Sequence, residues 1–217
     1  MNEIQETKIN KIKIEGQLFS WLIDFVKIAA VFIAIFIVSF TILNFPAVFI
    51  QAKYFFKSIT ATKIMQANID PIILYKTKIS KDTLNIPKID VNTPVHWNVL
   101  QNEDLVPLET GVAHFKGTAF PGNFGNVFIY GHSSYYWWNK GSYKEVFALL
   151  DKLKIGDHIY VNYNDKQYSY TVTDKKVVSP KNISVLTQDN TKKTLSLMTC
   201  TPVGTTLNRL IVTAAQD

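Results

Sequence analysis

The stretch that decides the fold is Thr194-Leu-Ser-Leu-Met-Thr-Cys200-Thr-Pro-Val-Gly-Thr-Thr-Leu-Asn-Arg209-Leu-Ile-Val. Apolar and polar side chains alternate up to Cys200, as they do in a half-buried β-strand. Pro202 cannot donate to a strand ladder, so this strand ends just after Cys200. A second strand-like run covers residues 207–214. We predict two strands joined by a glycine-containing loop, which brings Cys200 and Arg209 onto one rim.

Cys200 and Arg209 are each the single residue of their type in the chain. Cys200 is the only cysteine in 217 residues, so packing, an intermolecular bond and thiol chemistry are its possible roles. Its position at a strand end favours chemistry. Arg209 is the only arginine among 23 basic residues. Either it reflects chance in a lysine-rich chain, or it supplies a planar fork of donors for an oxyanion or carbonyl, which lysine does not.

A cysteine nucleophile needs a proton partner, and the chain has four histidines. His132 follows an apolar, β-prone run and therefore lies at a strand end. His114 is the competitor in local context. His96 lies in a stretch that reads as a loop because it contains Pro94, and His158 reads as an exposed residue at the start of a strand. The pattern favours His132.

The order His, Cys, Arg resembles the sortase family of cysteine transpeptidases. The resemblance covers residues 84–215 and is carried by several further motifs: Leu84-Asn-Ile-Pro-Lys-Ile-Asp-Val, Gly111-Val-Ala-His-Phe-Lys-Gly-Thr-Ala-Phe-Pro-Gly, Val127-Phe-Ile-Tyr-Gly-His, and Leu149-Leu-Asp-Lys-Leu-Lys-Ile-Gly-Asp. The Thr-Cys pair at a strand end, followed nine residues later by Arg and an apolar strand, is the specific part of this signal.

The resemblance implies a role for each site residue. The thiolate of Cys200 would attack the Thr-Gly carbonyl of a Leu-Pro-x-Thr-Gly-like sorting signal. His132 would protonate the departing amine and later act as the base, and Arg209 would stabilise the tetrahedral intermediate. Thr199 and His114 are candidates for substrate contact. Thr199 would contribute through its hydroxyl or backbone, or else it is an ordinary β-branched strand residue.

The expected fold class is mostly β, with a catalytic domain over residues 84–217. The resemblance implies a closed antiparallel β-barrel of about eight strands with short helices. Two alternating runs around Asn164-Asp165-Lys166 predict a hairpin, and residues 143–153 predict a helical turn.

A transmembrane helix is expected over residues 28–50, which contain no charged residue. About 23 residues at 1.5 Å each cross roughly 30 Å of hydrocarbon. Pro46 is where that helix would kink or stop. Residues 1–27 would form a short tail, and residues 51–83 a connector with a helix over 51–68. A buried core helix is the alternative, but the run is apolar on every face.

The expected location is the cell membrane, with a single pass, the N-terminus in the cytoplasm and the barrel outside. Lysines on the two sides of the span give little bias, so this orientation rests on the resemblance. The expected partners are the lipid bilayer, secreted proteins with C-terminal sorting signals, and an amine acceptor such as a peptidoglycan precursor or a protein lysine. The net charge of +6 is spread along the chain, which argues against nucleic acid. We expect neither cofactor nor metal.

Two features leave alternatives open. The aromatic loop, Tyr135-Tyr-Trp-Trp138, either lines a substrate groove or touches the membrane interface, or, as we favour, packs two of its rings into the end of the barrel and covers it with the others. The subclass is also open: the Cys-to-Arg spacing resembles the pilin-polymerising branch, but Asp70-Pro71-Ile72 lacks that branch's aromatic residue and no second span precedes Asp217. Another envelope thiol peptidase, or a membrane-tethered β-module without catalysis, are the rival functions.

Overall fold

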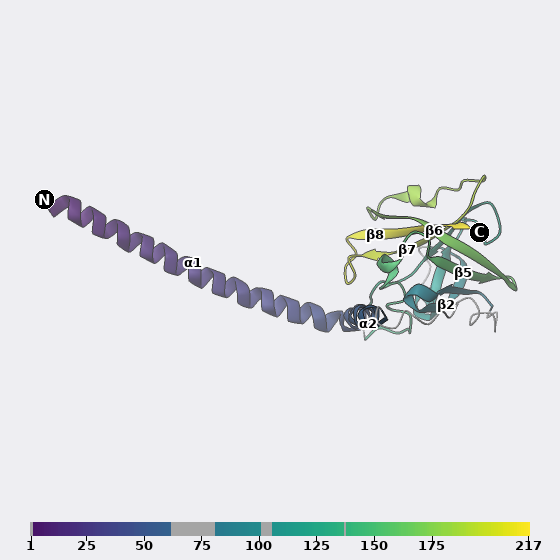
Figure 1. Ribbon diagram of the computed structural model, residues 1–217, viewed down its shortest axis with the longest axis horizontal. Helices are drawn as coiled ribbons and strands as arrows, with labels where there is room; N and C mark the ends of the chain where they lie inside the picture. The colour runs from purple at the N-terminus through teal and green to yellow at the C-terminus, as the bar shows by residue number, and fades with distance from the viewer. Residues whose placement is uncertain (1, 62–80, 101–105, 137) are drawn as a thin grey trace. The chain divides into compact units, whose positions relative to one another are not determined.

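The computed structural model describes residues 2–61, 81–100, 106–136 and 138–217 (Figure 1). The chain divides into two compact units, Met1–Leu43 and Asn44–Asp217. The first unit is a single helix. The second contains a helix and a closed barrel of eight strands. The fold class predicted from the sequence is therefore confirmed.

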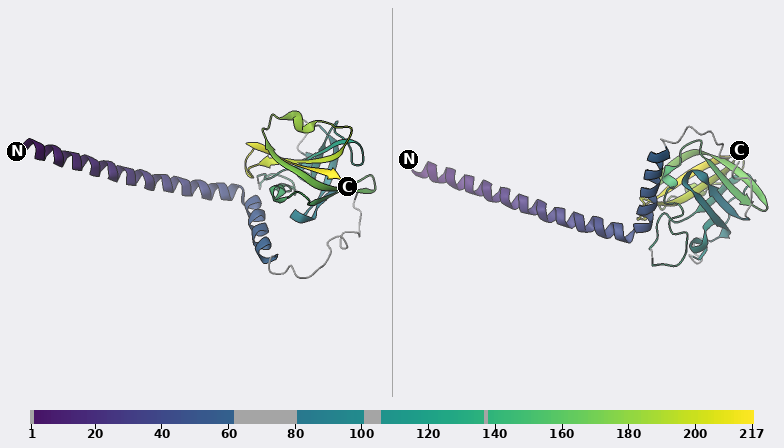
Figure 2. Two further views of the ribbon diagram at one scale, coloured as in Figure 1. Left: turned by 45° about the horizontal axis from the view of Figure 1, so that its top comes forward. Right: turned by 60° about the horizontal axis from the view of Figure 1, so that its bottom comes forward.

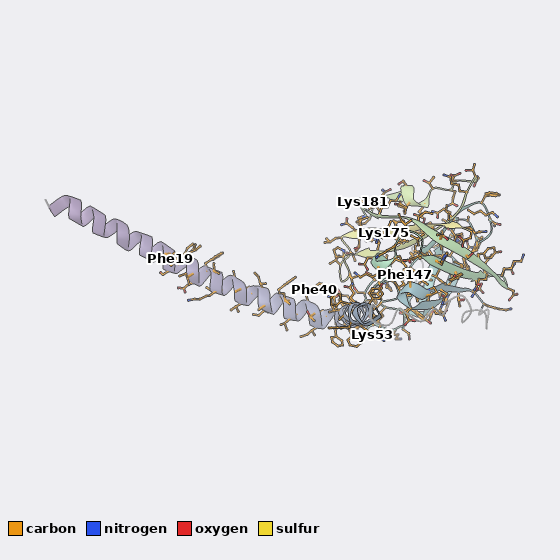
Figure 3. The ribbon with its side chains drawn as sticks, in the orientation of Figure 1. Phe19, Phe40, Lys53, Phe147, Lys175 and Lys181 are labelled. Atoms are coloured by element: carbon orange, nitrogen blue, oxygen red, sulfur yellow. The ribbon has the colours of Figure 1, made fainter. Side chains whose placement is uncertain are left out.

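The first unit consists of helix α1 (Asn2–Leu43), whose segment Phe19–Leu43 is long and apolar enough to cross a membrane. Its side chains project from the helix into the surroundings between Phe19 and Phe40 (Figure 3). The expected apolar run over 28–50 is divided between two helices, because α1 ends at Leu43. Pro46 accounts for this break, since its ring and missing amide hydrogen are incompatible with a continuous helix.

Helix α2 (Phe45–Ala61) opens the second unit and packs against the barrel. Ala47 is buried, and Ile50 and Tyr54 contact the hydrophobic core. The Gln51 side chain donates a hydrogen bond to the carbonyl of Ala148 at 3.4 Å. The helix expected over 51–68 thus begins six residues earlier, at Phe45, and residues 62–80, with the Asp-Pro-Ile motif, lie outside the described residues.

The strands close into a barrel (Figures 1 and 2). Their order around it is β1-β2-β3-β4-β7-β8-β6-β5. Short helices α4 and η1–η3 lie in the connections. The expectation of an antiparallel barrel holds for most neighbours, but β2–β3 and β4–β7 are parallel pairs. The elements are β1 (Thr83–Ile86), η1 (Pro87–Ile89), β2 (Val91–Val99), α4 (Val106–Thr110), β3 (Val112–Phe115), β4 (Gly125–Tyr130), η2 (Leu150–Lys152), β5 (His158–Tyr163), β6 (Lys166–Val178), η3 (Ile183–Leu186), β7 (Lys193–Thr201) and β8 (Asn208–Gln216).

The barrel core is built from alternate residues of these strands. Successive side chains of a strand point to opposite faces, so burial alternates at the start of β2, whereas β1 and most of β4 are buried on both faces. Most of the inward side chains are aliphatic, and the largest inward side chain is the aromatic Tyr170. The fully buried members include Leu84, Ile129, Ile159, Val161, Tyr170, Leu195, Leu197, Val212 and Ala214.

The hairpin predicted between β5 and β6 is confirmed. Tyr163 pairs with Lys166, so Asn164 and Asp165 form a two-residue turn. Both have positive φ, 51° and 59°, as a turn that matches the twist of its strands requires. The helical turn expected over residues 143–153 appears as consecutive turns that end in the 3-10 helix η2, which buries Leu150.

One local prediction was wrong. The segment around Pro94 and His96 was expected to be a loop but belongs to strand β2. Pro94 pairs with Thr83 of β1, and β3 joins β2 only from Val95 onward. Proline is tolerated there because it lies at the border of the second pairing, where a missing amide hydrogen is least costly.

Candidate active site

The first relationship in the site is the pairing of Cys200 with Arg209. Strands β7 and β8 run antiparallel, and these two residues are direct partners in their register. Directly opposed residues of an antiparallel pair project from the same face, with Cβ atoms about 4.5–5.5 Å apart. Their chain neighbours Thr199 and Leu210 are buried on the other face. The predicted rim that joins Cys200 and Arg209 is therefore present.

The position of His132 follows from the parallel pairing of β4 with β7. Tyr130 pairs with Met198, and the Gly131 amide donates to the Met198 carbonyl at 3.1 Å. Because the two strands run in the same direction, two further residues along each chain lead to His132 and Cys200. The strand order β4-β7-β8 thus brings histidine, cysteine and arginine to neighbouring positions at one edge of the barrel.

Thr199 connects the two chain segments that carry His132 and Cys200. Its side chain is buried, and its hydroxyl donates a hydrogen bond to the Gly131 carbonyl at 2.9 Å. Gly131 directly precedes His132, and Thr199 directly precedes Cys200. The hydroxyl is therefore used to hold two segments of the site, and this geometry favours a positioning role over direct substrate contact.

The His132 ring lies between burial and exposure. Burial lowers the pKa of His132 below its ordinary value, because desolvation penalises the imidazolium. Tyr135 stacks on the ring with a centroid distance of 4.7 Å and an interplanar angle of 14°. The backbone is also fixed, since the Phe147 amide donates to the His132 carbonyl at 2.9 Å. The sequence placed Tyr135 in an aromatic loop but did not reveal this stack.

Arg209 is held at the start of β8 by its own loop. One guanidinium nitrogen, Nη1, donates to the carbonyls of Thr206 and Asn208 at 3.0 and 3.1 Å. Within the described residues no carboxylate lies within 4.0 Å of the guanidinium. The remaining donors of the fork are therefore not neutralised by a protein acid among those residues, which suits a group that meets an incoming oxyanion.

His114 has a different environment from His132. Its ring is fully buried, and Nδ1 accepts a hydrogen bond from the Asn98 amide at 3.2 Å. Its other nitrogen, Nε2, contacts the Ala119 carbonyl and the Thr118 hydroxyl, both at 2.9 Å. Desolvation lowers the pKa of His114. Because both nitrogens are engaged by protein groups, the geometry gives His114 a structural role and does not favour the substrate contact expected from sequence.

The other histidines lie outside this edge. His96 of β2 contacts the Thr110 hydroxyl at 2.8 Å. His158 is exposed at the start of β5, as predicted. Within the described residues no three His, Cys, Asp or Glu side chains gather closely enough to hold a metal ion.

The aromatic loop keeps at least two of its rings exposed, and the arrangement favoured from sequence, two rings packed and two covering the barrel's end, stays a prediction because residue 137 lies outside the described residues. Tyr136 and Trp138 stack on each other at 4.7 Å, yet their side chains are 52% and 54% exposed. Of the three rings that the structure describes in this loop, Tyr135 contacts the site, through its stack with His132. The loop therefore presents two aromatic rings to the surroundings beside the candidate active site.

Gln188 is a positioning residue that the sequence did not reveal. Its side-chain oxygen accepts from the amides of Ala119 and Asn126 at 3.2 and 2.9 Å. Its nitrogen donates to the carbonyls of Asn126 and Leu186 at 3.2 and 2.9 Å. These bonds fix the connection between β6 and β7 to the start of β4. No sequence pattern identifies such a residue, because two of its partners, Ala119 and Asn126, lie about 60–70 residues away in the chain.

Comparison with known proteins identifies the family of the barrel. A family model described as a sortase domain matches residues 84–217. Sortase D of Bacillus subtilis strain 168 is 28% identical over 132 residues, which are 59% of this chain and 60% of that protein. Sortase A of Streptococcus agalactiae serotype III is 30% identical over 129 residues, 59% of this chain and 49% of that protein. The chain therefore matches only about half to three-fifths of the length of these curated relatives.

Solved structures give the same fold. A Clostridium perfringens sortase D5 transpeptidase has a TM-score of 0.52 and 33% identity, over 62% of this chain and 77% of that one. Sortase C1 of Streptococcus suis has a TM-score of 0.55 and 26% identity, over 63% of this chain and 72% of that one. Both align with a part of the chain about as long as the barrel.

Proposed function

This chain belongs to the sortase family, and from that premise we propose that it is a cysteine transpeptidase that attaches secreted proteins to the cell surface. Its substrate would carry a Leu-Pro-x-Thr-Gly-like sorting signal that is cleaved between Thr and Gly. The single observation that carries the proposal is the register that joins His132, Cys200 and Arg209 at one edge. Acyl transfer through a thioester needs a nucleophile, a proton-transfer group and a donor for the oxyanion, and thiol, imidazole and guanidinium can fill these roles.

In the first half-reaction the Cys200 thiolate attacks the Thr carbonyl carbon of the signal. The carbonyl oxygen takes the negative charge of the tetrahedral intermediate, and Arg209 donates hydrogen bonds to it. When the intermediate collapses, the C–N bond to glycine breaks and a C–S bond remains. His132, as imidazolium, gives its proton to the departing amine. The products are a thioester on Cys200, a free glycine amine and a neutral His132.

In the second half-reaction an amine attacks the thioester. His132 is now neutral and takes the proton of the incoming amine, so a new C–N bond forms as the C–S bond breaks. The thiolate and the imidazolium are restored. Burial lowers the pKa of His132, which favours the neutral form that this step needs and makes the imidazolium of the first half-reaction the minor form near neutral pH. The acceptor would be a peptidoglycan precursor or a protein lysine.

The location follows from helix α1. Its apolar segment is compatible with a single-pass membrane anchor, and sortases are enzymes of the cell envelope. We extend this to a topology in which the N-terminus is cytoplasmic and the barrel is extracytoplasmic. A protease added to cells without a wall should then remove the barrel and spare the N-terminal tail. If the barrel resists the protease in intact cells and is digested only after lysis, the barrel lies in the cytoplasm and the proposed orientation is wrong.

A transpeptidation assay separates the candidate functions. The purified chain is incubated with a small library of pentapeptide signals, with and without an added amine, and the products are identified by mass. A transpeptidase yields the amide formed with the added amine. A thiol peptidase yields only the hydrolysed acid, and a β-module without catalysis yields neither product.

A further inference from the structure

Helix α2 has two opposite faces, and only one of them is covered by the barrel. The covered face consists of Ala47, Ile50, Gln51 and Tyr54, which recur at the spacing of one side of a helix. Ala47 is buried there, Ile50 and Tyr54 are partly buried against the core, and the Gln51 amide donates a hydrogen bond to the barrel. The helix is therefore fixed in orientation about its own axis within the second unit.

The opposite face carries large apolar side chains. Phe45, Phe49 and Phe56 are 58%, 56% and 67% exposed. Their spacing of four and seven residues aligns them on one side of a helix with about 3.6 residues per turn, away from the docked face. Phe45 and Phe49 stack at 5.9 Å. Lys53, labelled on α2 in Figure 3, is exposed beside this stripe.

Chain connectivity limits how far the exposed phenylalanine face of α2 can lie from the membrane. Only Asn44 separates the end of the apolar segment at Leu43 from the start of α2 at Phe45. One residue spans at most about 3.6 Å. If Phe19–Leu43 crosses a bilayer, α2 must therefore begin at the membrane surface. A phenylalanine stripe bordered by a lysine is the composition of a helix that lies in the interface, with the ammonium at the lipid headgroups.

We propose that α2 is an interfacial helix, which lies in the lipid surface on its Phe45, Phe49 and Phe56 face and holds the barrel beside the membrane. This inference rests on the membrane anchor in the proposed function and goes beyond it, because an anchor alone leaves the barrel free to move away on a tether. Because the docked face of α2 packs on the barrel, a helix held in the lipid surface would keep the barrel at a fixed distance from the membrane.

The test measures which residues contact lipid in the full chain. A nitroxide label is attached to single cysteines in a Cys200→Ala background, and the protein is reconstituted in vesicles of phosphatidylcholine and phosphatidylglycerol. Collisions with oxygen, which concentrates in lipid, are compared with collisions with a water-soluble nickel chelate. Phe49→Cys is the test position. Ser39→Cys in α1 reports whether the span is inserted.

Ile183→Cys is the matched control, since this apolar side chain is 80% exposed on η3. Asn126, at the start of β4, donates to the Val185 carbonyl of η3. Helix α2 instead contacts the carbonyl of Ala148. The neighbouring Phe147 amide donates to the His132 carbonyl, which lies just past the end of β4. The control thus lies at the other end of β4 from α2.

The proposal predicts that labels at positions 39 and 49 collide preferentially with oxygen and that the label at 183 collides with the nickel chelate. A lipid signal at 39 with a water signal at 49 overturns the interfacial helix and leaves the anchor intact. A water signal at 39 overturns the anchor itself. Spin–spin broadening at 49 that disappears on dilution with unlabelled protein would assign this face to a second copy of the chain instead.

Discussion

The Thr199 hydroxyl donates a hydrogen bond to the Gly131 carbonyl at 2.9 Å, and so links the residue before Cys200 to the residue before His132. The two segments are about 70 residues apart in sequence. Strand pairing alone ends at Tyr130 and Met198. Together with the bond from the Gly131 amide to the Met198 carbonyl, it extends the β4–β7 contact to the level of the proposed nucleophile and its proton partner.

Thr199→Val should lower kcat with little effect on KM, because valine keeps the shape and loses the bond that aligns Cys200 with His132. Leaving the Gly131 carbonyl without its buried partner should also cost about 1–3 kcal/mol of stability. Thr199→Ser, which keeps the hydroxyl, should restore most of kcat. If valine and serine lower activity equally, the hydroxyl does not position the site.

Tyr135→Ala should raise the pKa of His132 toward its ordinary value of 6.5, because removing the stacked ring admits water to the imidazole. Tyr135→Phe keeps the stack and should leave the titration where it is. The ring protons of His132 can be followed by NMR in a Cys200→Ala background, with assignment by His132→Gln. An unchanged titration in the alanine variant would show that Tyr135 does not contribute to the burial of His132.

Arg209→Lys should lower kcat/KM by roughly 10²-fold or more, the size expected for loss of an oriented donor to the oxyanion. Both side chains are cationic, so the loss would come from the fork and not from charge. The melting temperature and the alkylation rate of Cys200 should change little. Parental turnover in the lysine variant would remove Arg209 from the proposed mechanism.

His114 predicts a pH dependence of stability. Its Nδ1 accepts a hydrogen bond in the folded protein, and burial lowers its pKa. As pH falls below 6.5, the unfolded histidine binds a proton that the folded one does not, so the free energy of unfolding falls. His132 adds to the same trend. Above this range neither histidine makes the free energy of unfolding depend on pH.

Urea unfolding between pH 5 and 8 measures this dependence. His114→Gln should flatten the slope below pH 6.5, even if it lowers stability at every pH. A parental slope in His114→Gln would show that His114 binds protons equally in the two states.

The sequence predicted those parts of the fold that depend on local pattern. Strands β7 and β8 follow from alternation and from Pro202, and the β5–β6 turn follows from Asn164 and Asp165, which accept positive φ. The parallel pairing of β4 with β7 is a contact between distant segments, and the residue pattern of neither strand indicates its partner. Pro94 misled the prediction, since proline at the border of a pairing looks in sequence like a loop.

The candidate site was predictable in its residue types and less so in its contacts. His132 was favoured over His114 because it follows a strand, and the structure separates them by their hydrogen bonds. Nothing local reveals that Asn98 and Ala119 engage the His114 ring. The stack of Tyr135 on His132 and the bonds of Gln188 likewise depend on how loops close, which residue spacing does not encode.

The most direct test of the proposed mechanism is the intact mass of the chain after brief incubation with a sorting-signal peptide and no amine. The account predicts an added mass equal to the peptide's acyl part through threonine, located on Cys200 and discharged when an amine is supplied. Cys200→Ala should fold normally, since one thiol without a disulfide is lost, and should carry no adduct and form no product. Product formation by Cys200→Ala at a rate near that of the parent would contradict the central claim.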